Sequence, residues 1–251
     1  MKKDNDFKNI IDPKLQLNLY GYKDYFNSFV KLYHKRQFPN AMLFTGAKGL
    51  GKSTFTYHLI NYLLSNDEPN NYDIQNLIIN SENSSYNLLL NKVHPNFFSL
   101  ESSSISKEIK IDEVRKLLKF LNNTVYSKNI KIVMIDNAEL LNPNAANALL
   151  KVLEEPSENT FFFIISSSSS KVLNTVASRC AEYKFHFNQK NKLDIFTKLL
   201  VNYNYKIDND NAEKFLIHET QGNLLKYLSL TEDNELNAFD DNLLSIYYLI
   251  D

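Results

Sequence analysis

The sequence predicts an α/β domain built on a parallel sheet, followed by a smaller all-α domain. Short apolar runs alternate with segments whose apolar residues recur at helical spacing. The runs are apolar at every position rather than at every second one, which is typical of parallel strands buried on both faces. After about residue 186 the strand pattern disappears. We therefore expect a first domain over 1–186 and a helical domain over 187–251.

The composition is that of an ordinary soluble globular protein. The chain has 251 residues, 43% of them hydrophobic and 23% charged, with a formal net charge of -1. Wholesale disorder and a basic DNA-wrapping protein are therefore disfavoured. The single cysteine, Cys180, excludes an internal disulfide and a multi-cysteine zinc cage in this chain, so no zinc is expected. No stretch reaches the roughly 20 apolar residues of a membrane helix, and we expect a cytoplasmic protein without a membrane role.

The first elements are a helix, a strand and a second helix. Residues 24–37 carry apolar side chains at helical spacing, and Pro39 stops that helix. The run 41–45 is too short for a helix and leads into glycines, which predicts a buried strand, a glycine loop and a helix over 52–64. The polar, Asn-rich segment 66–92 reads as an insertion.

The same alternation continues to residue 165. Asn142 is a good N-cap and Pro143 suits a first helical turn, so one helix begins there and ends at Pro156. Beyond residue 186 the apolar spacing predicts three short helices. The expected strands are 97–100, 130–135 and 160–165, and the expected helices are 112–121, 143–155, 193–200, 212–216 and 224–228.

A glycine-rich loop carries the strongest chemical signal. Residues 46–53 match the pattern G-x-x-x-x-G-K-[ST] between a predicted strand and a predicted helix, which is the context that a phosphate loop requires. Small residues let backbone N–H groups surround phosphates, and Lys52 would reach the outer phosphates. The Ser53 hydroxyl would complete a Mg²⁺ shell. The pattern predicts a nucleotide site.

An acidic residue follows a neighbouring buried strand. Asp136 ends the run 130–135, where a nucleotide site needs a carboxylate to hold Mg²⁺. The next residue is Asn137, and an amide cannot act as a general base. Arg179 follows a predicted short helix; from the residues alone, a solubilising surface arginine is the more common case than a catalytic one.

Several blocks of the sequence together resemble the clamp-loader AAA+ proteins, and within them the delta-prime subunits of bacterial DNA polymerase III. The resemblance extends over roughly residues 15 to 230, and its most specific parts are the A-N-A-L-L-K-x-L-E-E-P block and the S-R-C box. It implies a RecA-like AAA+ domain, a small helical lid and the start of a helical collar. The blocks that carry it are 94–95, 111–115, 135–139, 142–156 and 178–180.

The resemblance also implies roles for individual residues. Arg179 corresponds to an arginine finger that acts in trans, in the nucleotide site of a neighbouring subunit. Ser167, or its neighbour Ser166, lies in the region of the sensor for the terminal phosphate. Asp136 and Ser53 correspond to the Mg²⁺ ligands. The residues expected to bind ATP or ADP are Gly46, Gly49, Gly51, Lys52, Ser53, Asp136 and Ser167.

Three departures from the motor subunits of that family are informative. Asn137 replaces their catalytic Glu, Leu225 replaces a sensing Arg, and the Asn-rich insertion stands where many relatives carry a four-cysteine zinc module. The first two changes favour a delta-prime-like subunit, a class that characteristically lacks ATPase activity. We therefore expect weak or absent turnover by this chain itself.

The leading hypothesis is a clamp-loader stator within the DNA polymerase III holoenzyme. Its expected partners are the motor subunits, the clamp-opening subunit, the sliding clamp and primer–template DNA. The alternative is a catalytically active AAA+ ATPase of the gamma/tau motor type, which the intact phosphate loop keeps open. A P-loop kinase has less support because no acceptor site is identifiable.

Overall fold

The computed structural model describes residues 12–101, 108–123 and 130–202. The chain divides into two compact units, one over Pro13–His186 and the other made of Met1–Asp12 with Phe187–Asp251. Of the second unit the description covers Asp12 and residues 187–202, including helix α8 (Gln189–Asn202), whose Ile195, Phe196, Leu199 and Leu200 are buried. The expected helices at 212–216 and 224–228, and Leu225, lie outside the described residues.

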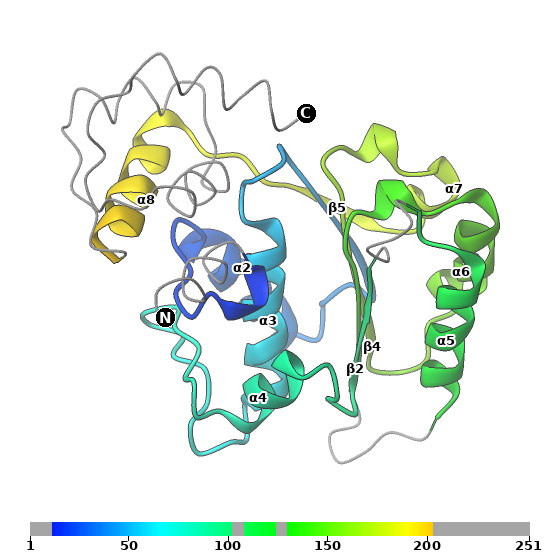
Figure 1. The fold of residues 1–251 in the computed structure, drawn as a ribbon, viewed down its shortest axis with the longest axis horizontal. Helices are drawn as coiled ribbons and strands as arrows, with labels where there is room; N and C mark the ends of the chain where they lie inside the picture. The colour runs from blue at the N-terminus through cyan, green and yellow to red at the C-terminus, as the bar shows by residue number, and fades with distance from the viewer. Residues whose placement is uncertain (1–11, 102–107, 124–129, 203–251) are drawn as a thin grey trace, which may run out of the picture. The chain divides into compact units, whose positions relative to one another are not determined.

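The larger unit is a parallel sheet with helices on both faces (Figure 1). All four strand pairings are parallel, and the order across the sheet is β2-β3-β4-β1-β5. The predicted α/β class with a parallel sheet is confirmed. The strands are β1 (Ala41–Thr45), β2 (Phe97–Leu100), β3 (Lys131–Ile135), β4 (Thr160–Ile165) and β5 (Ala181–Lys184).

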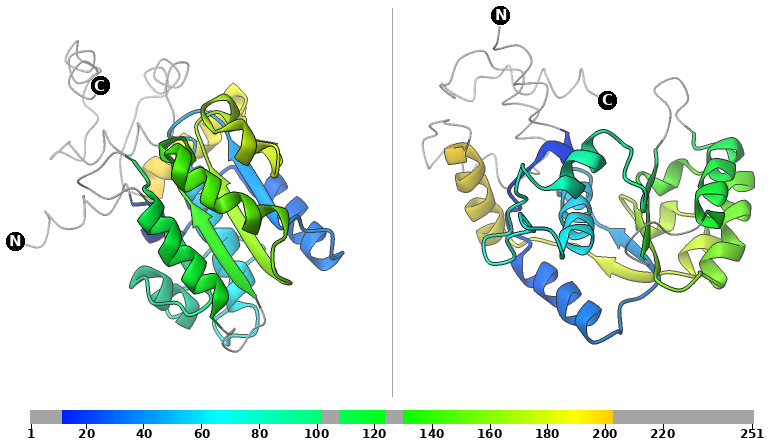
Figure 2. Two further views of the ribbon diagram at one scale, coloured as in Figure 1. Left: turned by 90° about the vertical axis from the view of Figure 1, so that its right-hand side faces the viewer. Right: turned by 90° about the horizontal axis from the view of Figure 1, so that it is seen from below.

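The helices fall into two layers. Helices α2, α3 and α4 cover one face of the sheet, and α5, α6 and α7 cover the other; α5 and α6 cross in front of the sheet in the left view of Figure 2. Short 3-10 turns η1 (Pro13–Leu15), η2 (Ala138–Leu140) and η3 (Ser169–Lys171) join the elements. The helices are α2 (Lys23–His34), α3 (Lys52–Ser65), α4 (Ser84–Leu90), α5 (Ile111–Asn122), α6 (Pro143–Glu154) and α7 (Asn174–Ala177).

Alternate residues of the strands build two different cores. On β1, Leu43 belongs to an aliphatic core shared with α5, α6 and α7, whereas Phe44 enters an aromatic core shared with α2 and α3. Successive side chains of a strand point to opposite faces, so one apolar run supplies both layers. This explains why the strands are apolar at every position.

Most predicted elements are confirmed, but helix α8 begins at Gln189 rather than at residue 193, and the segment 66–92 contains helix α4, whose position was not predicted. The first helix ends at His34 rather than residue 37, because Arg36 takes a left-handed conformation (φ 56°) before Pro39. The helix at 143 begins as predicted: the Asn142 side chain accepts from the Ala145 N–H at 2.9 Å. Strand β5 was missed, because its four residues include Glu182 and Lys184 and it lies at the sheet edge.

Candidate functional site

The loop between β1 and α3 has the backbone geometry that its glycines predict. Gly46, Gly49 and Gly51 all have positive φ, at 145°, 81° and 82°. A Cβ added at Gly46 would lie 2.7 Å from the backbone oxygen of Phe185. Only glycine satisfies both the conformation and the close approach at residue 46. The predicted strand–loop–helix arrangement is therefore present.

The ammonium group of Lys52 lies against this loop. Its Nζ donates to the Gly46 carbonyl at 2.7 Å and to the Ala47 carbonyl at 2.9 Å. Burial lowers the pKa of Lys52, while the carboxylates of Asp136 and Glu139 act in the opposite direction. A partly desolvated cation at the start of a helix is suited to an anionic ligand.

Ser53 and Asp136 meet across the site. The Ser53 hydroxyl donates to Asp136 Oδ2 at 2.9 Å, which joins the first turn of α3 to the end of β3. Burial raises the pKa of Asp136, the hydrogen bonds from Ser53 and the Asn137 N–H lower it, and the Glu101 carboxylate raises it further. A hydroxyl beside a carboxylate is an oxygen donor set that fits Mg²⁺ held together with nucleotide phosphates.

The end of β4 lies between these two segments because β4 separates β1 from β3. There Ser167 donates to Glu139 Oε1 from its hydroxyl at 3.0 Å and from its N–H at 3.4 Å. Burial alone would raise the pKa of Glu139, but its own N–H and the two serines Ser166 and Ser167 hold that pKa below its usual range. Sequence reasoning missed Glu139; its signal was a carboxylate three residues after Asp136.

Two further residues complete this edge of the sheet. Asn137 is exposed with φ 54°, and its N–H donates to Asp136 Oδ1 at 2.8 Å. Tyr22, which the sequence did not single out, is buried beside Phe55 and donates from its hydroxyl to the Leu50 carbonyl at 2.7 Å. Tyr22 therefore holds the phosphate loop in place through the Leu50 carbonyl.

Arg179 lies near the amino-terminal end of strand β5, whereas the phosphate loop follows the carboxyl-terminal end of β1. Arg179 comes two residues before β5, which pairs in parallel with β1 so that Lys184 faces Thr45, directly before the loop. Arg179 lies in the turn that precedes β5, and the four residues of that strand span about 13 Å at about 3.3 Å a residue. A single side chain does not bridge that separation, so Arg179 is not brought together with Lys52, Ser53 and Asp136.

The lone cysteine next to Arg179 has the properties of a packing residue. Cys180 is partly buried, and its Sγ lies 3.3 Å from the Val176 carbonyl. Burial raises the pKa of its thiol to about 12. A thiol that stays protonated at neutral pH is a poor nucleophile.

Comparison with protein families gives a match over most of the described chain. A family described as "DNA polymerase III, delta subunit" matches residues 21–189. The chain belongs to that family. The resemblance to AAA+ clamp-loader proteins is thereby confirmed.

Individual relatives carry related names. The DNA polymerase III subunit delta' of Pseudomonas aeruginosa is 42% identical over 95 residues, which cover 38% of this chain and 29% of that protein. The Escherichia coli subunit delta' is 30% identical over 155 residues, covering 62% of this chain and 45% of that protein. A subunit gamma of Buchnera aphidicola is 26% identical over 136 residues, covering 54% and 37%. The matches thus span less than half the length of these relatives.

Solved structures support the fold. The RuvB Holliday junction branch migration motor of Thermotoga maritima has a TM-score of 0.53 at 14% identity, covering 88% of this chain and 64% of RuvB. Domain III of the Thermotoga maritima replication initiation protein DnaA has a TM-score of 0.50 at 14% identity, covering 91% and 87%. The RecA-like AAA+ fold is confirmed by this likeness. Among the described residues, no helix is long and apolar enough to cross a membrane.

Proposed function

We propose that this chain is a delta-prime-like stator of a clamp loader, which supplies Arg179 to the nucleotide site of an adjacent motor subunit. The observation that carries the proposal is the separation of Arg179 from the chain's own phosphate loop by the length of β5. Because Arg179 lies far from the phosphate loop, its side chain does not reach a nucleotide bound by the same chain. A neighbouring subunit packed against this end of the sheet would contact it. Arg179 then neutralises charge on the phosphoryl group transferred next door.

The chain's own site binds ATP or ADP with Mg²⁺ in this proposal. Backbone N–H groups at Gly46, Gly49 and Gly51 surround the phosphates, and Lys52 leaves the loop carbonyls to contact the outer phosphates. Ser53 and Asp136 would hold Mg²⁺, which would supply positive charge to the phosphate oxygens. Ser167 senses the terminal phosphate in this proposal, and its hydroxyl bond to Glu139 supports that role by orienting the side chain.

Weak hydrolysis follows from the residue after Asp136. The Asn137 amide can orient a water molecule but cannot accept its proton. The Glu139 carboxylate is engaged by Ser167, and its lowered pKa makes it a weaker base. The alternative, an active ATPase of the gamma/tau type, is favoured only by the complete set of Lys52, Ser53 and Asp136.

Within this proposal the chain acts in the cytoplasm as part of the DNA polymerase III holoenzyme. Residues 1–186 form the nucleotide-binding domain, and 187–251 form the lid and the start of a collar. The partners are motor subunits and the clamp-opening subunit, and through them the sliding clamp and primer–template DNA. The net charge of -1 agrees with DNA contact made by the whole complex rather than by this chain alone.

Two measurements on the purified full chain test the stator proposal against the motor alternative. We expect negligible ATP turnover by the isolated chain, and co-purification with motor subunits from the same cell. Steady turnover of about one per second or more, abolished by Asp136→Ala, would instead establish the motor alternative. A chain that neither turns over ATP nor associates with motor subunits would contradict both.

A further inference from the structure

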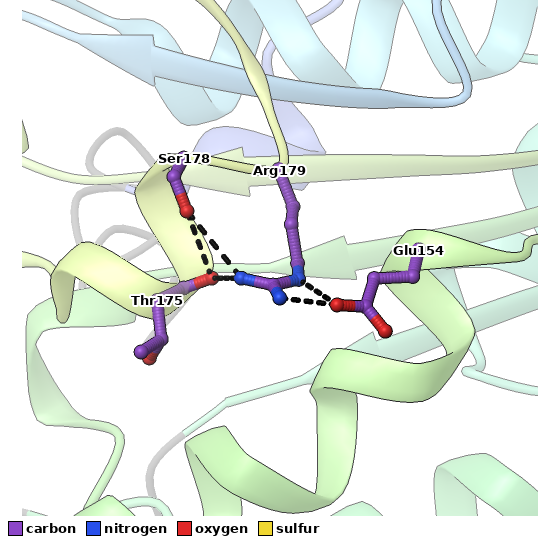
Figure 3. Close-up of polar contacts among 4 residues, drawn as sticks. All are labelled: Glu154, Thr175, Ser178 and Arg179. Carbon is purple, nitrogen blue, oxygen red and sulfur yellow. Dashed lines mark hydrogen bonds and ion pairs between the residues drawn. The ribbon is translucent and has the colours of Figure 1, made fainter.

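The guanidinium of Arg179 is held by its own subunit on two sides (Figure 3). Its Nε donates to Glu154 Oε1 at 2.7 Å, and Nη2 bonds to the same oxygen. On the other side, Nη1 donates to the Thr175 carbonyl at 2.7 Å and lies 3.4 Å from the Ser178 hydroxyl. These contacts use two edges of the planar group and define its orientation.

The aliphatic core fixes the distance between the two halves of this arrangement. Glu154 is the last residue of α6, and Thr175 lies in α7, and the two helices pack against each other. Leu149 and Leu153 of α6 and Val176 of α7 belong to one buried apolar cluster. The Glu154 carboxylate is therefore presented to Arg179 by a rigid support.

A second arginine of the chain shows what an ordinary surface pair looks like. Arg115 pairs with Asp112 at 2.7 Å on the same helix, and the two side chains are 64% and 75% exposed. The Arg179 side chain is only 29% exposed, and its partner Glu154 is 48% exposed and lies 25 residues away in the sequence. Exposed ion pairs contribute little to stability. The multiple contacts of Arg179 instead indicate a role in orientation.

We propose that Glu154 is a positioning residue that holds the Arg179 guanidinium in one orientation for a phosphate bound by the neighbouring subunit. The inference rests on the proposed function of Arg179 as a finger. A free arginine must lose its rotamer freedom when it engages a phosphate, and that loss weakens the interaction. Glu154 and the Thr175 carbonyl order the side chain beforehand, so less freedom is lost in the transition state.

The test uses ATP turnover by an assembly of the full chain with its motor subunits. Glu154→Ala should lower kcat about tenfold, equivalent to about 1.4 kcal/mol of transition-state stabilisation, with KM unchanged. Glu154→Gln, whose amide oxygen still accepts from the guanidinium, should fall between wild type and Glu154→Ala. Glu155→Gln, at the exposed neighbouring residue, is the matched control and should match wild type. In an Arg179→Ala background, Glu154→Ala should have no further effect.

A second readout reports the orientation directly. Nitrogen-15 relaxation of the Arg179 Nε–H group in the full chain should show an ordered side chain in wild type and Glu155→Gln, and a mobile one in Glu154→Ala. Thermal melts of all variants establish that each is folded.

The outcomes separate this inference from the proposed function. If Arg179→Ala cripples turnover but Glu154→Ala behaves like the Glu155→Gln control, the finger stands and the positioning role is wrong. Faster turnover by Glu154→Ala would also overturn the role, because it would show Glu154 competing with phosphate for the guanidinium. An unchanged rate in Arg179→Ala would overturn the proposed function, and the positioning role with it.

Discussion

The two ends of the parallel strands differ in how their polar groups are arranged. We call them the carboxyl edge, where the strands end, and the amino edge, where they begin. Four polar side chains at the carboxyl edge are buried or half-buried: Lys52, Ser53, Asp136 and Ser167. Lys52 donates to a carbonyl of the phosphate loop, Ser53 donates to Asp136, and Ser167 donates to Glu139. At the amino edge, Arg179 is partly exposed and held by Glu154 and Thr175. In the proposed function, the first arrangement binds a nucleotide within the chain, and the second presents one cation to a neighbouring subunit. A subunit built in this way is suited to binding one nucleotide and acting on another.

Strand β5 is the element that separates the two edges. Its first residue follows Arg179 and Cys180, and Phe185 just beyond its end brings a backbone oxygen against Gly46. The distance between the loop and Arg179 is therefore set by backbone pairing with β1 rather than by flexible side chains. Each edge can be altered separately, which makes the difference between them testable.

The largest effect is expected from Arg179→Ala. A finger arginine supplied in trans is worth about 10³ to 10⁵ in rate, because its guanidinium meets charge that develops on the phosphoryl group. In a reconstituted assembly this variant should cripple hydrolysis at the one motor site it faces. Arg179→Lys should rescue poorly, since an ammonium does not reproduce the planar fork. The measurement is DNA- and clamp-stimulated ATPase activity, with assembly checked by size exclusion.

The matched control is Arg115→Ala, which removes an exposed arginine from α5. It should leave the rate of the assembly unchanged. Thermal stability and nucleotide binding of the isolated chain should be unaffected by Arg179→Ala. Equal rates from intact wild-type and Arg179→Ala assemblies would show that the amino edge carries only a surface arginine.

The next largest effect concerns the carboxyl edge. ATP or ADP with Mg²⁺ at about 100 times its dissociation constant should stabilise the wild-type fold by about 2.7 kcal/mol, seen as a rise in the melting temperature. Lys52→Ala should abolish this rise, because the ammonium that contacts the outer phosphates is lost. Lys48→Ala, in the same loop but exposed, should retain it. A wild-type melting curve that neither nucleotide moves would refute binding at this edge.

The sequence was informative about the two edges to different degrees. The phosphate loop and Asp136 are short local patterns beside strongly apolar strands, and their placement followed from residue type and spacing. Arg179 acquired its role only through family resemblance, because its position depends on β5, which is too short and too polar to detect. Glu139, Tyr22 and Glu154 were not found as site residues at all. Each contacts a segment far from it in the chain or beyond its own element, and only the fold brings such pairs together.

A smaller effect is expected where the end of β5 meets the loop. Gly46→Ala places a Cβ 2.7 Å from the Phe185 oxygen in a conformation that L-residues rarely adopt. We expect the free energy of unfolding to fall by about 2 kcal/mol, within the usual range for strained backbone. Urea denaturation measures it. Gly51→Ala, whose Cβ meets only Tyr22 at 3.7 Å, should cost less; a larger cost there would show that the approach of Phe185 does not decide the loop geometry.

The smallest predicted effect is a loss of folding stability in acid, caused by a buried histidine on the side of the sheet that α3 covers. His58 lies in α3, behind the phosphate loop, with its ring nitrogens bonded to the Tyr72 hydroxyl at 2.9 Å and the Gln16 carbonyl at 3.0 Å. Burial lowers the pKa of His58 to about 3, whereas an unfolded histidine titrates near 6.5. The unfolded state therefore binds the extra proton as the pH falls from about 6.5 toward 3, and the folded state loses stability over that range. Between pH 6.5 and 5 the loss should be about 1.5 kcal/mol.

Urea denaturation at several pH values isolates this contribution. His58→Gln should lower stability at neutral pH but flatten its decline below pH 6.5, while His34→Gln, which removes a part-buried histidine bonded to the Tyr62 hydroxyl, should keep the decline. Burial raises the pKa of Asp136, so the folded state binds this proton more tightly than the unfolded state does. Protonation of Asp136 in acid therefore stabilises the folded state, which is the opposite of the effect of His58. The wild-type minus His58→Gln difference removes that contribution. An equal decline in wild type and His58→Gln would show that the buried imidazole is not the group that makes this side of the sheet sensitive to acid.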